Sequence, residues 1–454
     1  MTAPVRIPFP VVDEVSRHCL QEQEPETVHI EVHLPGPVDQ TRLRKAFTEA
    51  LHRHPRILMR EARGPWYRRR YEWELTPEPD VEVVTFTPPG PRALQDARTR
   101  ALTESPPLSM SPPIRLEVVG SVAGSRAAGA APDPPRAAPR QGGRAPQPAQ
   151  DTHTGTAQGT VLFLTINHTA LDGPACLRIL ATAAELYGGR DNAPAAPPTR
   201  TPQALQDPPD TPTTWSPPAR VAPGTPDPSP GNGMLVTELP LPHRPKGSPY
   251  TVNDQLMVTT ALTITHWNRE HGARPRPLRI TMPVDDRPRD TTMPIGNGTR
   301  LVEVPFASDE LDHPDMSALL RRTAERTRAL KSLHRPQLGH GAALLTTPWA
   351  PVAARAALTR ALRRAAAPWT STTLLSNIGR IPYPLDFGEE TGRAHAVWFS
   401  APARMPRGLT VTTASTAGRL HLALRWSRAL LSHGDGAHLR DLFEHYLHTT
   451  EVTP

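Results

Sequence analysis

The stretch VLFLTINHTALDGPACLRI, residues 161–179, decides how this chain folds. Its first six residues form an almost wholly apolar run, which favours a strand that is buried on both faces. Apolar residues then recur with helical spacing from Pro174 to Tyr187. Pro174 suits the first turn of such a helix, and Gly188-Gly189 suits its end. The stretch therefore predicts a buried strand, a short loop, and a helix whose N-terminus points back at the loop.

The loop of this stretch carries the residues with chemical potential. His168 follows the strand, Asp172 lies four residues later, and Gly173 comes next. A histidine at the exit of a buried strand can act as a general base, and the helix N-terminus favours a negative charge beside it. Taken alone, Asp172 is also typical of a simple helix N-cap, which stabilises by about 1 kcal/mol. Taken alone, His168 is also typical of a loop histidine whose hydrogen bonds go to backbone groups.

Other short motifs accompany the loop in a regular order along the chain. They are LPGPVD at 34–39, RHP at 53–55, PVDDR at 283–287, GN at 296–297 and SNIG at 376–379. The first two predict a helix that is capped by Asp39 and ended by Pro55. Alternating apolar residues on both sides of Ala417-Gly418 predict a hairpin near the C-terminus.

With these motifs the chain resembles the acyltransferases related to chloramphenicol acetyltransferase, whose signature is H-x-x-x-D-G. Relatives include the condensation domains of nonribosomal peptide synthetases and the polyketide-associated, wax-ester and BAHD acyltransferases. The resemblance implies an α/β fold of two chloramphenicol-acetyltransferase-like subdomains with mixed sheets. It further implies a V-shaped pseudo-dimer with an active-site tunnel between the subdomains.

The resemblance also implies roles for the residues of the loop. His168 is then the catalytic general base, and the amide of Gly173 is the donor to an oxyanion. Asp172 is then structural, because the family's aspartate pairs with an arginine after a P-V-D strand, and Arg287 is the matching residue here. The same likeness places Ser376 and Asn377 at strand ends that bind substrate.

One position departs from the most common pattern of these relatives. Most condensation and polyketide-associated relatives carry two adjacent histidines, and the first of them is Asn167 here. The second histidine is the catalytic one, and it is retained as His168. We expect Asn167 to contact substrate or to orient the loop through its amide.

The reaction implied by the resemblance is acyl transfer from a thioester to an amine or a hydroxyl. The donor is coenzyme A or the phosphopantetheine arm of a carrier protein, and the product is an amide or ester of specialised metabolism. No covalent acyl-enzyme, permanently bound cofactor or metal is expected. Two alternatives remain open: a non-catalytic module that recruits partner biosynthetic proteins, and a related fold used for cyclisation or epimerisation.

Composition divides the chain into two subdomains and a linker. The N-terminal subdomain is expected at 1–190, a Pro-rich linker at 191–244, and the C-terminal subdomain at 245–454. Residues 121–157 are rich in Ala, Pro, Gly and Arg and poor in large apolar residues. Such a tract cannot bury enough surface to offset the entropy of ordering, so we expect a disordered surface insertion there.

Charge and cysteine content exclude several classes of protein. The formal net charge is +7, but no basic helix or aromatic-and-basic stripe occurs, so a nucleic-acid partner is not expected. The tight cluster Arg68-Arg69-Arg70 is typical of a solvated edge, or of a contact with an acidic carrier protein or coenzyme A phosphates.

Two cysteines give neither a disulfide framework nor a metal site, and Cys176 fits a small core residue. Without a long apolar run or leader, we expect a cytoplasmic monomer with no membrane partner.

Overall fold

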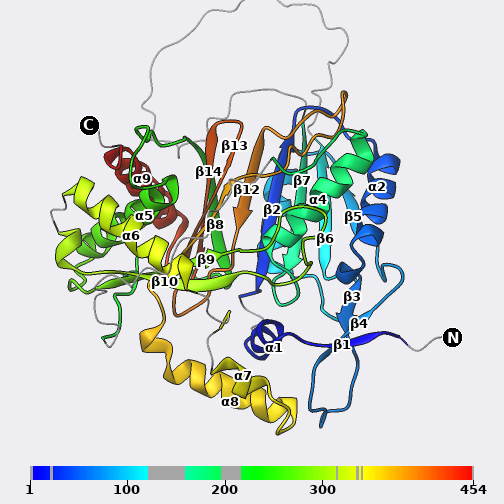
Figure 1. Ribbon diagram of the computed structural model, residues 1–454, viewed down its shortest axis with the longest axis horizontal. Helices are drawn as coiled ribbons and strands as arrows, with labels where there is room; N and C mark the ends of the chain where they lie inside the picture. The colour runs from blue at the N-terminus through cyan, green and yellow to red at the C-terminus, as the bar shows by residue number, and fades with distance from the viewer. Residues whose placement is uncertain are drawn as a thin grey trace, which may run out of the picture.

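The computed structural model describes residues 4–20, 24–120, 159–195, 216–312, 315–333, 337–338 and 341–451. The described chain is mixed α/β, with two large sheets that stand side by side and helices packed against each (Figure 1). The expected insertion at 121–157 lies outside the described residues. In the described part of the chain, none of the helices has the length and apolar character that crossing a membrane requires.

The first sheet contains the strand that precedes the motif. Its strands, in spatial order, are β12 (Ala396–Ser400), β2 (Thr27–Leu34), β7 (Thr160–Asn167), β6 (Ile114–Gly120) and β5 (Val84–Thr87). Strands β5 and β6 are parallel, while the other neighbours are antiparallel, so the sheet is mixed. The helices that pack with it are α2 (Gln40–Arg53), α3 (Ala93–Thr103) and α4 (Gly173–Gly188).

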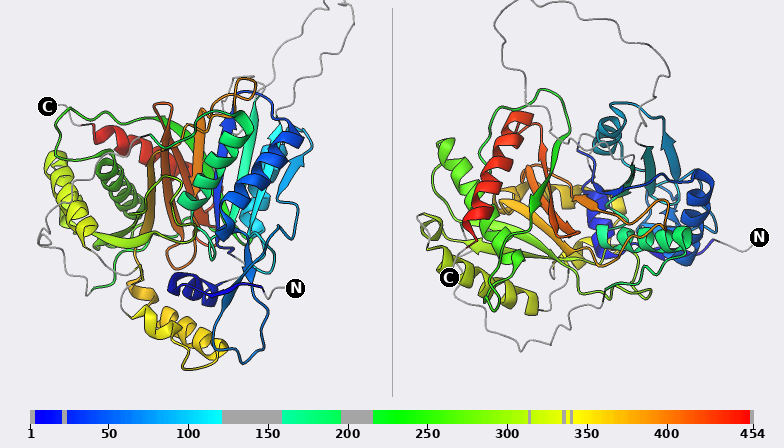
Figure 2. Two further views of the ribbon diagram at one scale, coloured as in Figure 1. Left: turned by 45° about the vertical axis from the view of Figure 1, so that its right-hand side comes forward. Right: turned by 90° about the horizontal axis from the view of Figure 1, so that it is seen from above.

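The second sheet is built from the C-terminal part of the chain. Its strands, in spatial order, are β10 (Arg300–Phe306), β9 (Leu278–Val284), β11 (Thr373–Arg380), β13 (Leu409–Thr416), β14 (Arg419–Ser427) and β8 (Asn232–Pro240). Strand β11 is parallel to β9 and β13, and the remaining pairs are antiparallel. Helices α5 (Val252–Glu270), α6 (Met316–Ser332) and α9 (His433–Thr449) pack with this sheet, as the two views of Figure 2 show.

A smaller layer lies at one end of both sheets, at the bottom of Figure 1. It consists of β1 (Arg6–Pro8), α1 (Val11–His18), β3 (Met59–Glu61), β4 (Glu72–Leu75), α7 (Ala342–Thr346) and α8 (Val352–Ala365). Three 3-10 turns complete the described elements, at Pro55–Ile57, Asp309–Leu311 and Ala367–Trp369. Helices α7 and α8 lie between β10 and β11 of the second sheet in sequence order but pack on α1, so this layer joins a segment of the second half of the chain to the N-terminal segment.

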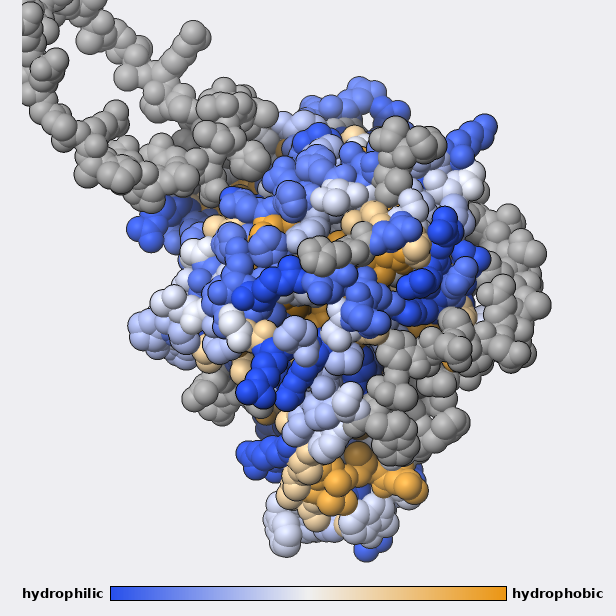
Figure 3. Space-filling view, turned by 90° about the vertical axis from the view of Figure 1, so that its left-hand side faces the viewer, coloured by the Kyte–Doolittle hydropathy of each residue, from blue (hydrophilic) through white to orange (hydrophobic). Residues whose placement is uncertain are grey.

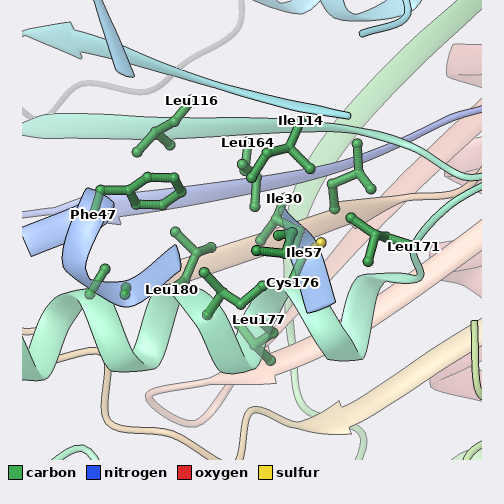
Figure 4. Packing of buried hydrophobic residues seen from close by; sticks show 14 of the residues in the cluster. Ile30, Phe47, Ile57, Ile114, Leu116, Leu164, Leu171, Cys176, Leu177 and Leu180 are labelled. Atoms are coloured by element: carbon green, nitrogen blue, oxygen red, sulfur yellow. The ribbon is translucent and has the colours of Figure 1, made fainter. Parts of the chain in front are cut away.

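The strand–loop–helix unit predicted around the motif is confirmed. Strand β7 runs along the middle of the first sheet, and α4 begins at Gly173 and ends at Gly189, whose φ of 63° suits glycine. Figure 4 shows Leu177 and Leu180 of α4 pointing into the core beneath the sheet. Each is 1% exposed, and burying such a side chain stabilises by about 1.5–3 kcal/mol. Cys176 is fully buried beside them, and burial raises the pKa of its thiol, so it is a core residue as expected.

The two sheets share more of the chain than composition indicates. Strand β12 follows the second sheet's β11 in sequence but pairs with β2 of the first sheet. Arg425 of β14 is buried and donates hydrogen bonds across the boundary to the carbonyl oxygens of Pro25 and Thr27. The expected linker, 191–244, also includes β8, the edge strand of the second sheet. Residues 232–240 form a strand by backbone pairing with β14, whereas the composition of the expected linker did not predict a strand there.

Buried neutral histidines give the fold a predictable response to acid. His54, at the end of α2, lies with Nε2 2.8 Å from the hydroxyl of Thr182 on α4. Burial, with Arg178 and Arg53 nearby, lowers its pKa to about 4, and burial lowers those of His18 and His421 to about 4. Between pH 6.5 and 4 the unfolded chain therefore binds more protons at these sites, so stability falls as the pH falls. Burial raises the pKa of Asp13 to about 6 and also raises that of Glu14, so these two groups act with the opposite sign against the three histidines.

We expect the His54→Gln variant to lose part of this pH dependence. We would measure the free energy of unfolding with urea at several pH values from 7 to 4. Its decrease with falling pH should be less steep in the variant than in the wild-type chain, by up to about 1.4 kcal/mol per pH unit for one proton. His438→Gln is the matched control, because His438 lies at the surface, where it pairs with Glu270 and its ring lies beside Trp267. Parallel curves for the wild-type chain and His54→Gln would contradict the assignment.

Candidate active site

Backbone hydrogen bonds fix the loop between β7 and α4. The amides of Ala170 and Leu171 both donate to the carbonyl oxygen of Asn167, so the chain reverses direction as the strand ends. The amide of His168 donates to the carbonyl oxygen of Glu26, at 2.9 Å, on the segment that leads into β2. His168 is therefore held by its own turn and by the neighbouring strand.

The imidazole of His168 has its tautomer set by a backbone partner. Nδ1 lies 3.0 Å from the carbonyl oxygen of Leu171. A carbonyl oxygen can only accept, so in the neutral ring Nδ1 carries the proton and Nε2 has a free lone pair. His168 is partly exposed and forms part of a cavity wall, so the loop offers a proton acceptor to whatever occupies the cavity.

The cavity beside His168 has a volume of about 390 Å³, within the range of small-molecule sites. Its wall combines residues of both sheets with the motif loop and α4. The main contributors are Val28, His168, Asp172, Gly173 and Leu177 from the first half, and Met282–Asp285, Thr299, Ser376–Ile378, Phe399 and Arg407 from the second. The sequence motif therefore lies at the junction of the two halves, and segments from both shape the space in front of it.

Asp172 is held from three directions and faces a cation. One carboxylate oxygen accepts from the amide of Ala175 and caps α4, and the other accepts from Arg287 Nη2 at 2.7 Å and from the Gly298 amide at 2.8 Å. The guanidinium also donates to both oxygens of Asp285. Burial alone lowers the pKa of Arg287, but these two carboxylates outweigh it and raise its pKa above the ordinary value. The ion pair with Arg287 is present as the resemblance implies, and Asp172 has no direct contact with His168 among the described hydrogen bonds.

Asn297 also holds the loop between β7 and α4 in place. Its side-chain amide donates to the carbonyl oxygens of His168 and Thr169 and to the carboxylate of Asp13 on α1. The Gly296-Asn297 motif lies in the loop before β10, where Asn297 holds the backbone of the loop between β7 and α4.

The three residues expected to bind substrate separate into two groups. Ser376 and Asn377 of β11 both line the cavity. The side-chain oxygen Oδ1 of Asn377 already accepts from the Gly379 amide and the Thr413 hydroxyl, so this side chain chiefly shapes the strand. Asn167 is not among the described residues of the cavity wall: it is 4% exposed, donates to the Pro106 carbonyl and accepts from the Thr169 amide. Its amide orients the loop, which is the second of the two roles expected of it, and no substrate contact is indicated.

Gly173 begins α4 in a space that a larger residue would not fit. A Cβ at this position would lie 3.2 Å from two ring carbons of Phe399 on β12. Because Gly173 has no side chain, Phe399 can pack against the start of α4, and a ligand can approach the same helix N-terminus. The sequence does not reveal this contact, because β12 reaches the first sheet only through tertiary pairing.

We expect Gly173→Ala to lower the free energy of unfolding by about 1–3 kcal/mol, the usual cost of overpacking a core. Phe399→Leu in the same chain should relieve the clash, so that the double variant loses less than the sum of the single variants. Gly90→Ala is the control, since a Cβ there has no neighbour within 4 Å. Additive losses in urea unfolding would show that the two residues do not press on each other.

The basic cluster of residues 68–70 lies away from this cavity. Arg68 donates to Glu61 and to the carbonyl of Ala62, and its guanidinium lies 4.5 Å from the centre of the Tyr71 ring. Arg69 and Arg70 are exposed in the loop between β3 and β4. The arrangement fits a solvated edge.

Comparison with known proteins places the fold. No family model matches the chain. An uncharacterized protein of Mycobacterium tuberculosis, described from two strains, is 26% identical over 412 residues, which is 84% of either protein.

Solved structures give a more specific comparison. A trichothecene 15-O-acetyltransferase of Fusarium sporotrichioides matches 99% of this chain and 95% of its own, with a TM-score of 0.61 and 11% identity. The first condensation domain of the CDA synthetase matches 100% and 98%, with a TM-score of 0.60 and 13% identity. The starter condensation domain of rhizomide synthetase, solved with C8-CoA, matches 98% and 95%, with a TM-score of 0.61 and 14% identity. The chain thus has the mixed α/β fold that these condensation-domain and acetyltransferase structures share.

Proposed function

We propose that this protein transfers an acyl group from a thioester to an amine or a hydroxyl, with His168 as the general base. The observation that carries the proposal is the state of the His168 ring: Nδ1–H is anchored on the Leu171 carbonyl, and the imidazole lines the cavity. Such a base typically accelerates a reaction by about 10²–10⁴-fold.

The proposed step follows from the positions of the loop residues. Nε2 of His168 accepts the proton of the acceptor's N–H or O–H group as that atom attacks the thioester carbonyl carbon. The tetrahedral oxyanion then collapses, the C–S bond breaks, and the leaving thiolate takes the proton from the imidazolium. We assign the amide of Gly173, at the N-terminus of α4, as a donor to the oxyanion. Asp172 takes no proton in this scheme, because Arg287 and two amides occupy its oxygens.

The class of donor is supported by the fold neighbours and the cavity. Condensation domains and an acetyltransferase share the fold, and one of these domains was solved with C8-CoA. The cavity wall here includes Leu177, Met282 and Phe399, which suit an acyl chain. We therefore propose an acyl thioester of coenzyme A or of a carrier-protein phosphopantetheine arm as the donor, with an amide or ester of specialised metabolism as the product.

A thiol-release assay tests the proposal against that of a non-catalytic recruiting module. Acyl-CoA and acyl-carrier thioesters of several chain lengths are mixed with amines and alcohols, and products are identified by mass spectrometry. We expect release of thiol that depends on the acceptor and matches the amount of acylated product. Release no faster than that of a folded His168→Ala variant, across all donors, would favour the recruiting module.

A further inference from the structure

Helix α8 has a buried face of mixed polarity and an exposed apolar face. Its buried face, which packs on α1 and the β3–β4 loop, contains Val352, Arg355, Ala356 and Thr359. The opposite face, here called the α8 outer face, is exposed and contains Ala354, Ala357, Leu358, Ala361, Leu362 and Ala365. Helical geometry puts these residues on one stripe, because they recur at intervals of three and four. An exposed helix face made only of Ala and Leu is unusual for a soluble protein and marks a contact surface.

Exposed aromatic and apolar residues also lie on the chain segments beside α8. Leu344 is 72% exposed and Trp349 is 58% exposed, and the indole N–H of Trp349 donates to the Leu344 carbonyl. Trp66 and Tyr67, in the β3–β4 loop, are 83% and 59% exposed. That loop is joined to α8, because the amide of Val352 donates to the carbonyl of Arg68. Figure 3 shows the hydrophobic colouring gathered over this lower end of the molecule.

The charge around the α8 outer face has one sign. The sequence contains no Asp or Glu between Glu325 and Asp386, and none between Glu61 and Glu72. The exposed arginines of these segments include Arg69 and Arg70 in the β3–β4 loop and Arg360 and Arg364 on α8. The surface is therefore apolar at its centre and positive around it, which is complementary to a surface that is apolar inside and negative outside.

We propose that the α8 outer face, with Trp66, Tyr67, Leu344 and Trp349, docks on the surface of an anionic lipid bilayer. The helix, about 21 Å long for 14 residues, lies in the plane of the interface. Leu358 and Leu362 enter the boundary of the acyl chains, the tryptophans lie at the level of the headgroups, and the arginines bind lipid phosphates. The contact is peripheral and departs from the expectation that the protein has no membrane partner.

A bilayer fits this surface better than a protein partner does. The outer face offers methyl and isobutyl groups but no side-chain hydrogen-bond donor or acceptor along its centre, whereas specific protein interfaces carry a set of direct hydrogen bonds. It lies on a layer at one end of the molecule, where a flat surface can reach it (Figure 1). Arg363, in the last turn of α8, and Thr370 line the cavity in front of His168. If the proposed function holds, docking brings an edge of that cavity to the lipid and favours substrates that partition into it.

Vesicle co-sedimentation of the full chain tests the docking independently of activity. We expect the protein to sediment with vesicles of phosphatidylcholine and phosphatidylglycerol at low salt, and less with phosphatidylcholine alone or at high salt. The double variant Leu358→Gln/Leu362→Gln should have a partition coefficient into vesicles that is lower by about tenfold or more, because two leucines that the bilayer would bury are lost. Arg69→Gln/Arg364→Gln should lose the preference for anionic vesicles by about tenfold. Leu241→Gln, at a site that is 41% exposed on the strand-edge side, is the matched control and should bind like the wild-type chain.

Three results would overturn the proposal, given variants whose melting temperature is unchanged. The first is a wild-type chain that stays in the supernatant with anionic vesicles at low salt. The second is a Leu358→Gln/Leu362→Gln variant that still binds vesicles fully. The third combines two observations. The wild-type chain binds no vesicles, and the Leu358→Gln/Leu362→Gln variant loses either a dimer or turnover with carrier-bound thioesters while it keeps turnover with free thioesters. That result would assign the face to a second copy or to a carrier protein. Because sedimentation requires no turnover, failure of the proposed acyl transfer would leave this test standing.

Discussion

Replacing His168 by alanine is expected to lower acyl transfer by at least about a hundredfold, the scale of losing a general base. The fold should survive, because the ring forms a single described hydrogen bond, from Nδ1 to the Leu171 carbonyl. The loop backbone would still be held by the Glu26 carbonyl and by Asn297. Turnover of the purified variant in the thiol-release assay, beside its melting temperature, measures both effects.

A histidine far from the cavity provides the control. His52 on α2 forms an exposed pair with Glu78, a contact worth little to stability, so His52→Ala should keep full activity. Near-normal turnover in folded His168→Ala would remove His168 from the proposed reaction and leave the fold as the only basis for it.

Breaking the Asp172–Arg287 pair is expected to give the largest loss of stability. The two side chains are only 3% and 11% exposed, and removing one member of a buried pair typically costs about 3–5 kcal/mol. Arg287→Ala should be the more damaging change, because it leaves the carboxylates of Asp172 and Asp285 without their shared cation. Asp172→Ala leaves Arg287 still paired with Asp285. Activity should fall in both variants, since Asp172 caps the helix that begins at the loop of His168, the proposed general base.

A double-mutant cycle measured by urea unfolding separates the pair from its surroundings. The double variant should lose less than the sum of the single variants, because the second change removes the charge that the first left unpaired. Asp172→Asn is a useful intermediate, since an amide oxygen can still cap α4 without the negative charge. Strict additivity would count against a coupled pair, whatever the distance between the atoms.

The elements around the motif could be predicted because their signals are local. An uninterrupted apolar run, a helical repeat, and Pro and Gly at the two helix ends specify β7 and α4 within a few residues of chain. The same reasoning correctly predicted α2 with its Asp39 cap and the hairpin of β13 and β14 around Ala417-Gly418. Each of these patterns acts over one turn or one strand, so no distant residue is needed to read it.

Asn167 shows where sequence reasoning about the site leaves two roles open. A polar residue beside His168 is compatible with a substrate contact or with a hydrogen bond to the loop. The choice depends on which groups face its amide, and those are the Pro106 carbonyl and the Thr169 amide. Pro106 lies on a segment 61 positions away, so no local pattern could have indicated it.

The sequence by itself determined the strand–loop–helix unit, its histidine and acid, and, through family likeness, the pairing of Asp172 with Arg287. The tertiary structure alone decided that β12 joins the first sheet, that Phe399 presses on Gly173, and that Asn297 clamps the loop. It also decided that one cavity wall is shared by both halves and that α8 turns an apolar face outward. The physical reason is range: propensity and periodicity act between near neighbours, while strand exchange and cavity shape depend on contacts between segments hundreds of residues apart.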